Sequence, residues 1–206
     1  MSLANIITLL RAPLLLAIVA MLYVQDFWFP AAATALLPIL YLMDWFDGYV
    51  ARMKNQVTDL GSVLDIAIDR VVENALWVVF VDLDLAPLWV AMVFIIRSFV
   101  VDGMRGYALS KGKSAFGMMS SPLGRFLVAG RLMRGLYGLV KGAAFCVLAA
   151  VVSLGHLGPS WDPAYTVLHV LGQALVYLSA LLCIIRGLPV IWDIRPLLAP
   201  GSVKDK

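Results

Sequence analysis

The sequence predicts an all-α, polytopic membrane protein with six transmembrane helices, preceded by a short interfacial N-terminal segment. Of its 206 residues, 62% are hydrophobic and only 14% are charged. Apolar runs recur along the chain, each close to the ~20 residues that a helix needs to cross a bilayer. A very apolar soluble helical protein is the alternative. A soluble core of this size, however, does not need repeated stretches that are apolar on all sides.

Six stretches meet the length requirement for a transmembrane helix. They are 8–24, 31–52, 62–81, 87–108, 127–153 and 164–186. Residues 2–11 are expected to form an interfacial lead-in, because Arg11 interrupts the apolar run and no basic region of a cleaved leader precedes it. Cys146 and Cys183 both fall inside predicted spans and indicate neither a disulfide framework nor a metal site. We expect residues 1–206 to form a single integral-membrane domain.

The distribution of Lys and Arg predicts the orientation of these spans. Segments 24–30, 82–86 and 154–163 contain neither residue. The opposite side carries Arg52, Lys54, Arg105, Lys111, Lys113, Arg125, Arg186, Arg195, Lys204 and Lys206. This alternation places both termini in the cytosol. The net charge of +3 is then mostly a signal of topology, and no nucleic-acid partner is expected.

The second predicted span ends, and the third begins, with acidic residues. Asp44 and Asp47 are three positions apart, and Asp65 and Asp69 are four apart, so each pair shares one face of a helix. Two antiparallel helices can point both pairs into one space in the cytosolic half of the membrane. One aspartate at mid-membrane costs about 2.5–3.5 kcal/mol on insertion scales, so the cluster needs a compensating partner.

Two kinds of partner could compensate the charge of these acids. Glu73 adds a further carboxylate, while Arg52 and Arg70 could neutralise two of the acids. A set of ion pairs is therefore one interpretation, although it leaves at least two acids without a cation. Clustered carboxylates with too few local cations favour a divalent metal, and oxygen ligands suit Mg²⁺, Mn²⁺ or Ca²⁺.

Small residues accompany the acids. Gly48 follows Asp47, Ala51 lies one turn later, and Gly61 precedes the second pair. Glycine inside a helix costs up to ~1 kcal/mol relative to alanine, which is tolerable where a flat ligand approaches the backbone. Close helix packing explains any single glycine equally well. Arg52 is placed to meet a phosphate or to mark the cytosolic side. Together these residues predict a diphosphate-bearing ligand.

The complete pattern reads Asp44-x2-Asp47-Gly48-x2-Ala51-Arg52-x8-Gly61-x3-Asp65-x3-Asp69. It resembles the signature of the CDP-alcohol phosphotransferase (CDP-alcohol phosphatidyltransferase) family at every fixed position and spacing. The stretch NIITLLRAP at 5–13 is also similar to the usual opening of that family. The resemblance implies six transmembrane helices, a site facing the cytosol, a homodimer, and a place in a bacterial inner (plasma) membrane.

The resemblance also implies an activity, namely transfer of a phosphatidyl group from CDP-diacylglycerol to the hydroxyl of a polar alcohol, with release of CMP. The implied ligands of one or two Mg²⁺ or Mn²⁺ ions are Asp44, Asp47, Asp65 and Asp69, with Asp69 also the general base. The implied contacts to the cytidine and the diphosphate are Gly48, Ala51, Gly61 and Arg52. These roles suit the chemistry, because bridging metals neutralise a diphosphate and a carboxylate can take the proton of an attacking hydroxyl.

The acceptor alcohol is less well specified. A phosphorylated acceptor needs further cations, because intramembrane arginines usually have an anionic partner. The candidates are Arg97, Arg105, Arg125, Arg131 and Arg134. Segments 44–52, 55–65 and 95–113 are similar to the phosphatidylglycerophosphate synthases, which use glycerol 3-phosphate. Asp69 followed by Arg70 is more similar to synthases that use inositol or inositol phosphate. Glycerol 3-phosphate is the first choice.

Two other features leave alternatives open. A divalent-cation transporter could use the same carboxylates, but it does not explain the small residues and Arg52 at fixed spacing. Gly138 and Gly142 form a G-x-x-x-G motif in the fifth span. Such a motif packs helices either between two chains or within one chain.

Overall fold

The protein is described here by a computed structural model covering residues 3–53, 59–110, 125–157 and 161–193. Over these ranges the chain is helical and has no β-strand. Its elements are α1 (Leu3–Leu22), α2 (Trp28–Met53), α3 (Asp59–Asp82), α4 (Leu88–Ser110), η1 (Arg125–Ala129), α6 (Arg131–Leu154) and α7 (Asp162–Asp193), where η1 is a short π-helix. The all-α class is confirmed, and each predicted span corresponds to one long helix.

The N-terminal part differs from the prediction. Residues 3–11 are not a separate lead-in, because α1 runs without a break from Leu3 to Leu22. Thr8 and Arg11 are both buried in this first half of the helix. Arg11, the residue that suggested an interfacial segment, therefore faces the interior of the bundle.

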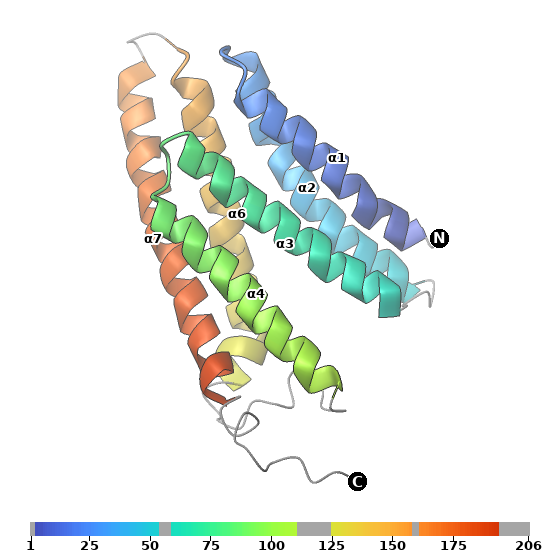
Figure 1. Cartoon of the computed structure of the whole chain (residues 1–206). Coiled ribbons are helices and arrows are strands. Elements are labelled where there is room, and N and C mark those ends of the chain that lie inside the picture. The colour runs from blue at the N-terminus through green and yellow to red at the C-terminus, as the bar shows by residue number, and fades with distance from the viewer. Residues whose placement is uncertain (1–2, 54–58, 111–124, 158–160, 194–206) are drawn as a thin grey trace, which may run out of the picture.

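The helices pack as an antiparallel bundle (Figure 1). Helix α1 lies against α2 and α3, α6 lies against α2 and α7, and α4 lies against α3 and α7. An aromatic cluster fixes α3, α4 and α6 together. In this cluster the Trp77 ring lies 4.7 Å from the rings of both Phe94 and Phe145, measured between centroids. All three side chains are fully buried, so they hold the middle of the bundle.

The turn between α3 and α4 is fixed by its backbone. Asp84 adopts a positive φ of 57°, a conformation that short polar residues tolerate better than most. The amides of Leu85 and Ala86 both donate to the carbonyl of Phe80. Beside this turn the Tyr23 hydroxyl donates to Asp82 over 2.5 Å, which raises the pKa of Tyr23 to about 12 and ties the end of α1 to α3.

Within the described ranges, four helices are long and apolar enough to cross a membrane, namely α1, α2, α6 and α7. Helices α3 and α4 have 24 and 23 residues and are not among these four; α3 carries six charged side chains, whereas α4 carries three, as α2, α6 and α7 do. The outer surface is rich in large apolar side chains, and Phe99, Leu132 and Leu139 are each more than two-thirds exposed. An exposed apolar surface of this extent is expected of a protein that faces lipid.

Candidate active site

The acidic residues of α2 and α3 meet at one place in the bundle. Asp44 comes from α2, while Asp65 and Asp69 lie one turn apart on α3. One oxygen of each of these carboxylates lies within 4.8 Å of the other two. The spacing in the sequence therefore corresponds to three acids that share one space. The side chain of Asp47, the fourth predicted ligand, lies outside the described part of the structure.

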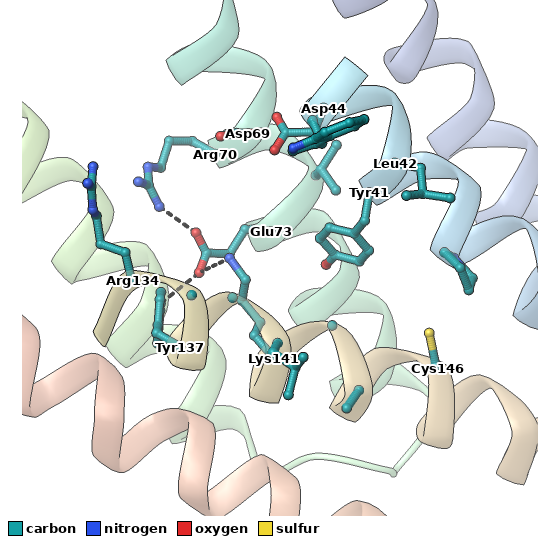
Figure 2. A pocket seen from close by; sticks show the side chains of 18 of the residues that line it. Tyr41, Leu42, Asp44, Asp69, Arg70, Glu73, Arg134, Tyr137, Lys141 and Cys146 are labelled. Carbon is teal, nitrogen blue, oxygen red and sulfur yellow. Dashed lines mark hydrogen bonds and ion pairs between the residues drawn. The ribbon is translucent and has the colours of Figure 1, made fainter. Parts of the chain in front are cut away.

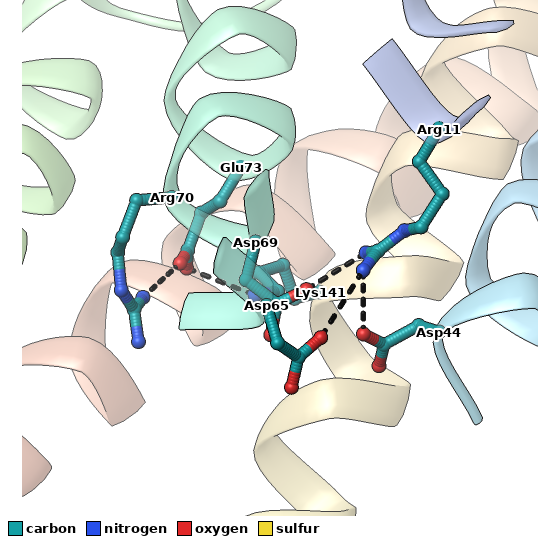
Figure 3. Close-up of polar contacts among 7 residues, drawn as sticks. All are labelled: Arg11, Asp44, Asp65, Asp69, Arg70, Glu73 and Lys141. Atoms are coloured by element: carbon teal, nitrogen blue, oxygen red, sulfur yellow. Dashed lines mark hydrogen bonds and ion pairs between the residues drawn. The ribbon is translucent and has the colours of Figure 1, made fainter. Parts of the chain in front are cut away.

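A buried arginine from α1 contacts all three of these acids (Figure 3). The Nη1 of Arg11 donates to Asp44 Oδ1 over 2.7 Å, and its Nη2 donates to Asp69 Oδ1 over 2.7 Å. The Nη1 also lies 3.7 Å from Asp65 Oδ1. Sequence reasoning missed this role and treated Arg11 as a break in an apolar run. An arginine inside such a run usually has an anionic partner, and that was the signal to follow.

This arrangement corrects the expected balance of charge. At least two acids were expected to lack a cation, yet the three clustered aspartates all contact Arg11. Glu73 contacts both Arg70 and Lys141. The expectation is therefore wrong for the acids whose side chains the structure describes. One guanidinium still faces three carboxylates, so the cluster keeps an excess of negative charge when the acids are ionised.

A second buried network lies beside the first and is centred on Glu73, which is 2% exposed (Figure 2). Its Oε1 lies 3.0 Å from Lys141 Nζ and accepts a hydrogen bond of 2.9 Å from the Tyr137 hydroxyl. Its Oε2 accepts a hydrogen bond from Arg70. Arg70 also contacts Asp102 of α4 over 2.9 Å. This network joins α3 to α6 and α4.

Three cations surround the ring of Tyr137. Arg97 lies 5.8 Å, Lys141 5.1 Å and Arg186 5.2 Å from the centroid of the ring. These distances are within the range of cation–π attraction, which helps to hold positive charge in a buried place. The three cations come from α4, α6 and α7 and so form a basic wall opposite the acids.

One cavity connects the acid cluster to the basic wall. It has a volume of about 1140 Å³, and Asp44 and Asp69 line one side of it. The cations that line it are Arg11, Arg70, Arg97, Arg134, Lys141 and Arg186. Figure 2 shows Asp44 and Asp69 at one side and Arg134, Tyr137 and Lys141 at the other. A cavity with both signs of charge suits a ligand with a metal-bound phosphate at one end and a free anion at the other.

The remaining predicted residues divide into two groups. Among the predicted acceptor residues, Arg97 and Arg134 line the cavity. Gly48 and Gly61 lie half-buried in α2 and in the first turn of α3. The predicted residues whose side chains lie outside the described part of the structure are Ala51, Arg52, Arg105, Arg125 and Arg131. Sequence reasoning did not place Lys141 or Arg186 in the site, because their partners come from other helices.

In the G-x-x-x-G motif of α6, Gly142 faces another helix of the same chain, whereas Gly138 is exposed. A Cβ atom at Gly142 would lie 3.8 Å from the ring of Tyr41 in α2. Gly138 and Gly142 both line the cavity. Gly138 and Gly142 therefore contribute to the wall of the cavity within one chain.

The acid cluster fits a divalent metal by its donor chemistry. Asp44, Asp65 and Asp69 bring carboxylate oxygens close enough together to bind one ion. Mg²⁺ and Mn²⁺ prefer oxygen ligands of this kind. The positions of these acids beside the cavity would put such an ion in reach of a phosphate group.

Comparison with known proteins gives a family and several relatives. Residues 1–192 match the CDP-alcohol phosphatidyltransferase family. A CDP-diacylglycerol–glycerol-3-phosphate 3-phosphatidyltransferase of Bacillus subtilis (strain 168) is 42% identical over 74 residues, which is 36% of this chain and 38% of the relative. The protein of the same name from Escherichia coli (strain K12) is 31% identical over 115 residues, which is 54% of this chain and 63% of the relative. The chain thus spans less than two thirds of either relative.

Proposed function

Because the chain belongs to the CDP-alcohol phosphatidyltransferase family, we propose that it transfers a phosphatidyl group from CDP-diacylglycerol to glycerol 3-phosphate and releases CMP. The observation that carries this proposal is a cavity that joins the cluster of aspartates to the cluster of cations around Tyr137. The names of the two relatives support glycerol 3-phosphate as the acceptor.

We propose that Asp44, Asp47, Asp65 and Asp69 hold one or two Mg²⁺ or Mn²⁺ ions. When bound, such an ion would neutralise the charge of the donor diphosphate. Asp69 lines the cavity and has a half-exposed side chain, so it can also reach an acceptor. Its carboxylate takes the proton of the acceptor hydroxyl as the oxygen attacks the lipid-side phosphorus. The bond from this phosphorus to the oxygen of CMP breaks, and CMP leaves.

The donor nucleotide is proposed to bind next to the acids. Gly48 and Gly61 would let the cytidine approach the backbone of α2 and α3, and Ala51 would add a small side chain. Arg52 would contact the diphosphate, where a guanidinium can donate two hydrogen bonds to phosphate oxygens. Gly48 lies one turn after Asp44 on α2, which supports a nucleotide beside the acid cluster.

The acceptor phosphate is proposed to bind the basic wall. Arg97 and Arg134 line the cavity there, together with Lys141 and Arg186. Lys141 already contacts Glu73, so the arginines supply most of the charge available to an anion. The other proposed residues of this subsite are Arg105, Arg125 and Arg131.

The proposal places the chain in a bacterial inner membrane with six spans and both termini in the cytosol. Helices α3 and α4 would cross it with α1, α2, α6 and α7, because their charged residues Arg70, Glu73 and Arg97 face the cavity and not the lipid. We also propose a homodimer. Its interface would not use Gly142 of the G-x-x-x-G motif, because Gly142 faces Tyr41 within the chain.

The direct test is release of CMP from CDP-diacylglycerol by the purified protein in lipid nanodiscs. We expect release only when a divalent metal and glycerol 3-phosphate are both present. Inositol, inositol phosphate, serine and phosphatidylglycerol serve as competing acceptors. Faster release with inositol phosphate would change the acceptor to an inositol type. No release with any acceptor, together with metal transport into vesicles, would favour a divalent-cation transporter.

Replacing Arg97 by glutamine is expected to impair use of the acceptor selectively. A hydrogen bond to a charged group contributes about 1.5–3 kcal/mol, so KM for glycerol 3-phosphate is expected to rise about 10- to 100-fold. KM for CDP-diacylglycerol is expected to stay within about threefold, since the donor lies at the acidic side. Ser98→Ala is the control, because Ser98 is buried next to Arg97 on α4 but does not line the cavity. An equal rise of both KM values would contradict the assignment of Arg97 to the acceptor.

A further inference from the structure

The guanidinium of Arg11 lies among carboxylates that belong to two other helices. We propose that Arg11 is an internal counter-cation that competes with the divalent metal for the cluster of Asp44, Asp65 and Asp69. It stabilises the cluster when no metal is bound, and it weakens the binding of metal. This inference rests on the metal-binding part of the proposed function and adds a residue from α1 to it.

The geometry fits a cation built into the fold. The Arg11 side chain is 1% exposed, and its two terminal nitrogens each donate 2.7 Å hydrogen bonds to different helices, to Asp44 on α2 and to Asp69 on α3. A planar guanidinium can make two such bonds at once, which a lysine ammonium cannot do in the same fixed arrangement. The guanidinium is buried, but the Asp44 and Asp69 side chains are 36% and 40% exposed, so salt in the solvent screens these pairs in part.

Removing the positive charge of Arg11 changes the metal affinity in a definite direction. Without Arg11, three carboxylates with oxygens within 4.8 Å of one another repel, and the metal-free protein is destabilised. With a divalent ion in the cluster, the positive charge of Arg11 instead repels that ion at short range. Removing the charge of Arg11 therefore destabilises the metal-free state and favours the metal-bound state, and both changes tighten metal binding.

If Arg11 only orients the ligands, the expected change in metal affinity is the opposite. Arg11 could serve only to orient the ligands, because each carboxylate has two oxygens and can contact arginine with one and metal with the other. Loss of a residue that orients metal ligands typically weakens metal affinity about 10- to 100-fold. Measurement of metal affinity therefore separates a competing cation from an orienting one.

The experiment compares the wild-type protein with Arg11→Gln and Arg11→Lys in nanodiscs. Mn²⁺ is titrated while the free ion is measured by electron paramagnetic resonance, and thermal unfolding is recorded with and without Mn²⁺. We expect Arg11→Gln to bind Mn²⁺ about tenfold or more tightly than the wild type, because one nearby positive charge is gone. Its melting temperature is expected to fall without metal and to recover with Mn²⁺. Arg11→Lys keeps the charge and is expected to bind Mn²⁺ within about threefold of the wild type.

Arg134→Gln is the matched control, because Arg134 lines the same cavity but lies on α6, which carries neither Arg11 nor the three acids. Its Mn²⁺ affinity is expected to stay within about threefold of the wild type.

Unchanged or weaker Mn²⁺ binding by Arg11→Gln would overturn the inference. If Arg11→Gln accumulates only when cells are supplied with Mn²⁺, the inference is supported. If it accumulates in neither condition, the inference is overturned, because metal then cannot replace Arg11. Failure of the wild type to bind Mn²⁺ would instead reject the metal site of the proposed function.

Discussion

Asp69→Asn is expected to abolish most phosphatidyl transfer while CDP-diacylglycerol still binds. The substitution keeps the shape of the side chain but removes the carboxylate that would take the proton of the acceptor hydroxyl. General-base catalysis contributes about 10²–10⁴-fold, and a weakened metal site adds to that loss, so we expect the rate to fall about 10³-fold or more. The fall is measured as CMP release at saturating acceptor and donor.

The control for this prediction lies on the same helix. Asp82→Asn makes the same chemical change near the far end of α3, where Asp82 contacts Tyr23. We expect it to keep CMP release within about threefold of the wild type, since asparagine can still accept the hydrogen bond from Tyr23. Metal-dependent binding of CDP-diacylglycerol, followed by thermal unfolding, shows whether Asp69→Asn retains its donor site. Retained turnover by Asp69→Asn would remove Asp69 from the role of general base.

The helices were predictable because their signals are local. A run of about 20 apolar residues requires a helix in lipid, since the backbone has no other way to satisfy its hydrogen bonds there. The error at residues 3–11 has a physical cause. Arg11 marks a polar position, and polarity alone does not tell whether a side chain faces the interface or the interior. Only the packing of α1 against α2 and α3 decides that.

The site was predictable in part for the same reason. The spacings of three and four residues put acids on single helix faces, and α1, which packs against both α2 and α3, brings the two acidic faces to one place. The partners of these acids are different, because they reach the acids from distant parts of the chain. Arg11 comes from 58 positions before Asp69, and Tyr137 from 64 positions after Glu73. No periodicity within one helix reports such pairings.

The network around Glu73 shows how these distant contacts hold the site in place. Arg70 was expected to neutralise one acid, and it does contact Glu73. The further contacts of Glu73 with Lys141 and Tyr137 fix α6 against α3. Tyr137 lies among Arg97, Lys141 and Arg186. Because Glu73 contacts both Tyr137 and Lys141, its carboxylate offsets part of the positive charge of the basic wall. A substitution at Glu73 is therefore expected to change the free energy of unfolding more than the rate of phosphatidyl transfer.

Glu73→Gln is expected to destabilise the protein by about 3–5 kcal/mol, the usual effect of removing one partner from a buried ion pair. Glutamine keeps the size of the side chain but leaves Lys141 and Arg70 without their shared carboxylate. Glu73 is 2% exposed and Lys141 is 14% exposed, so water compensates little. The free energy of unfolding is measured by denaturant titration in mixed micelles.

A second substitution separates loss of the ion pair from loss of packing. Lys141→Met removes the charge that Glu73→Gln leaves behind, while its unbranched chain fills a similar space. If the uncompensated charge causes the instability, the double variant is expected to be more stable than Glu73→Gln by about 1 kcal/mol or more, because residues in one buried network couple by about 0.5–3 kcal/mol. Equal stability of Glu73→Gln and the wild type would show that the carboxylate does not hold α3 and α6 together. Additive effects of the two substitutions would show instead that Arg70 and Tyr137, rather than Lys141, are the partners that matter.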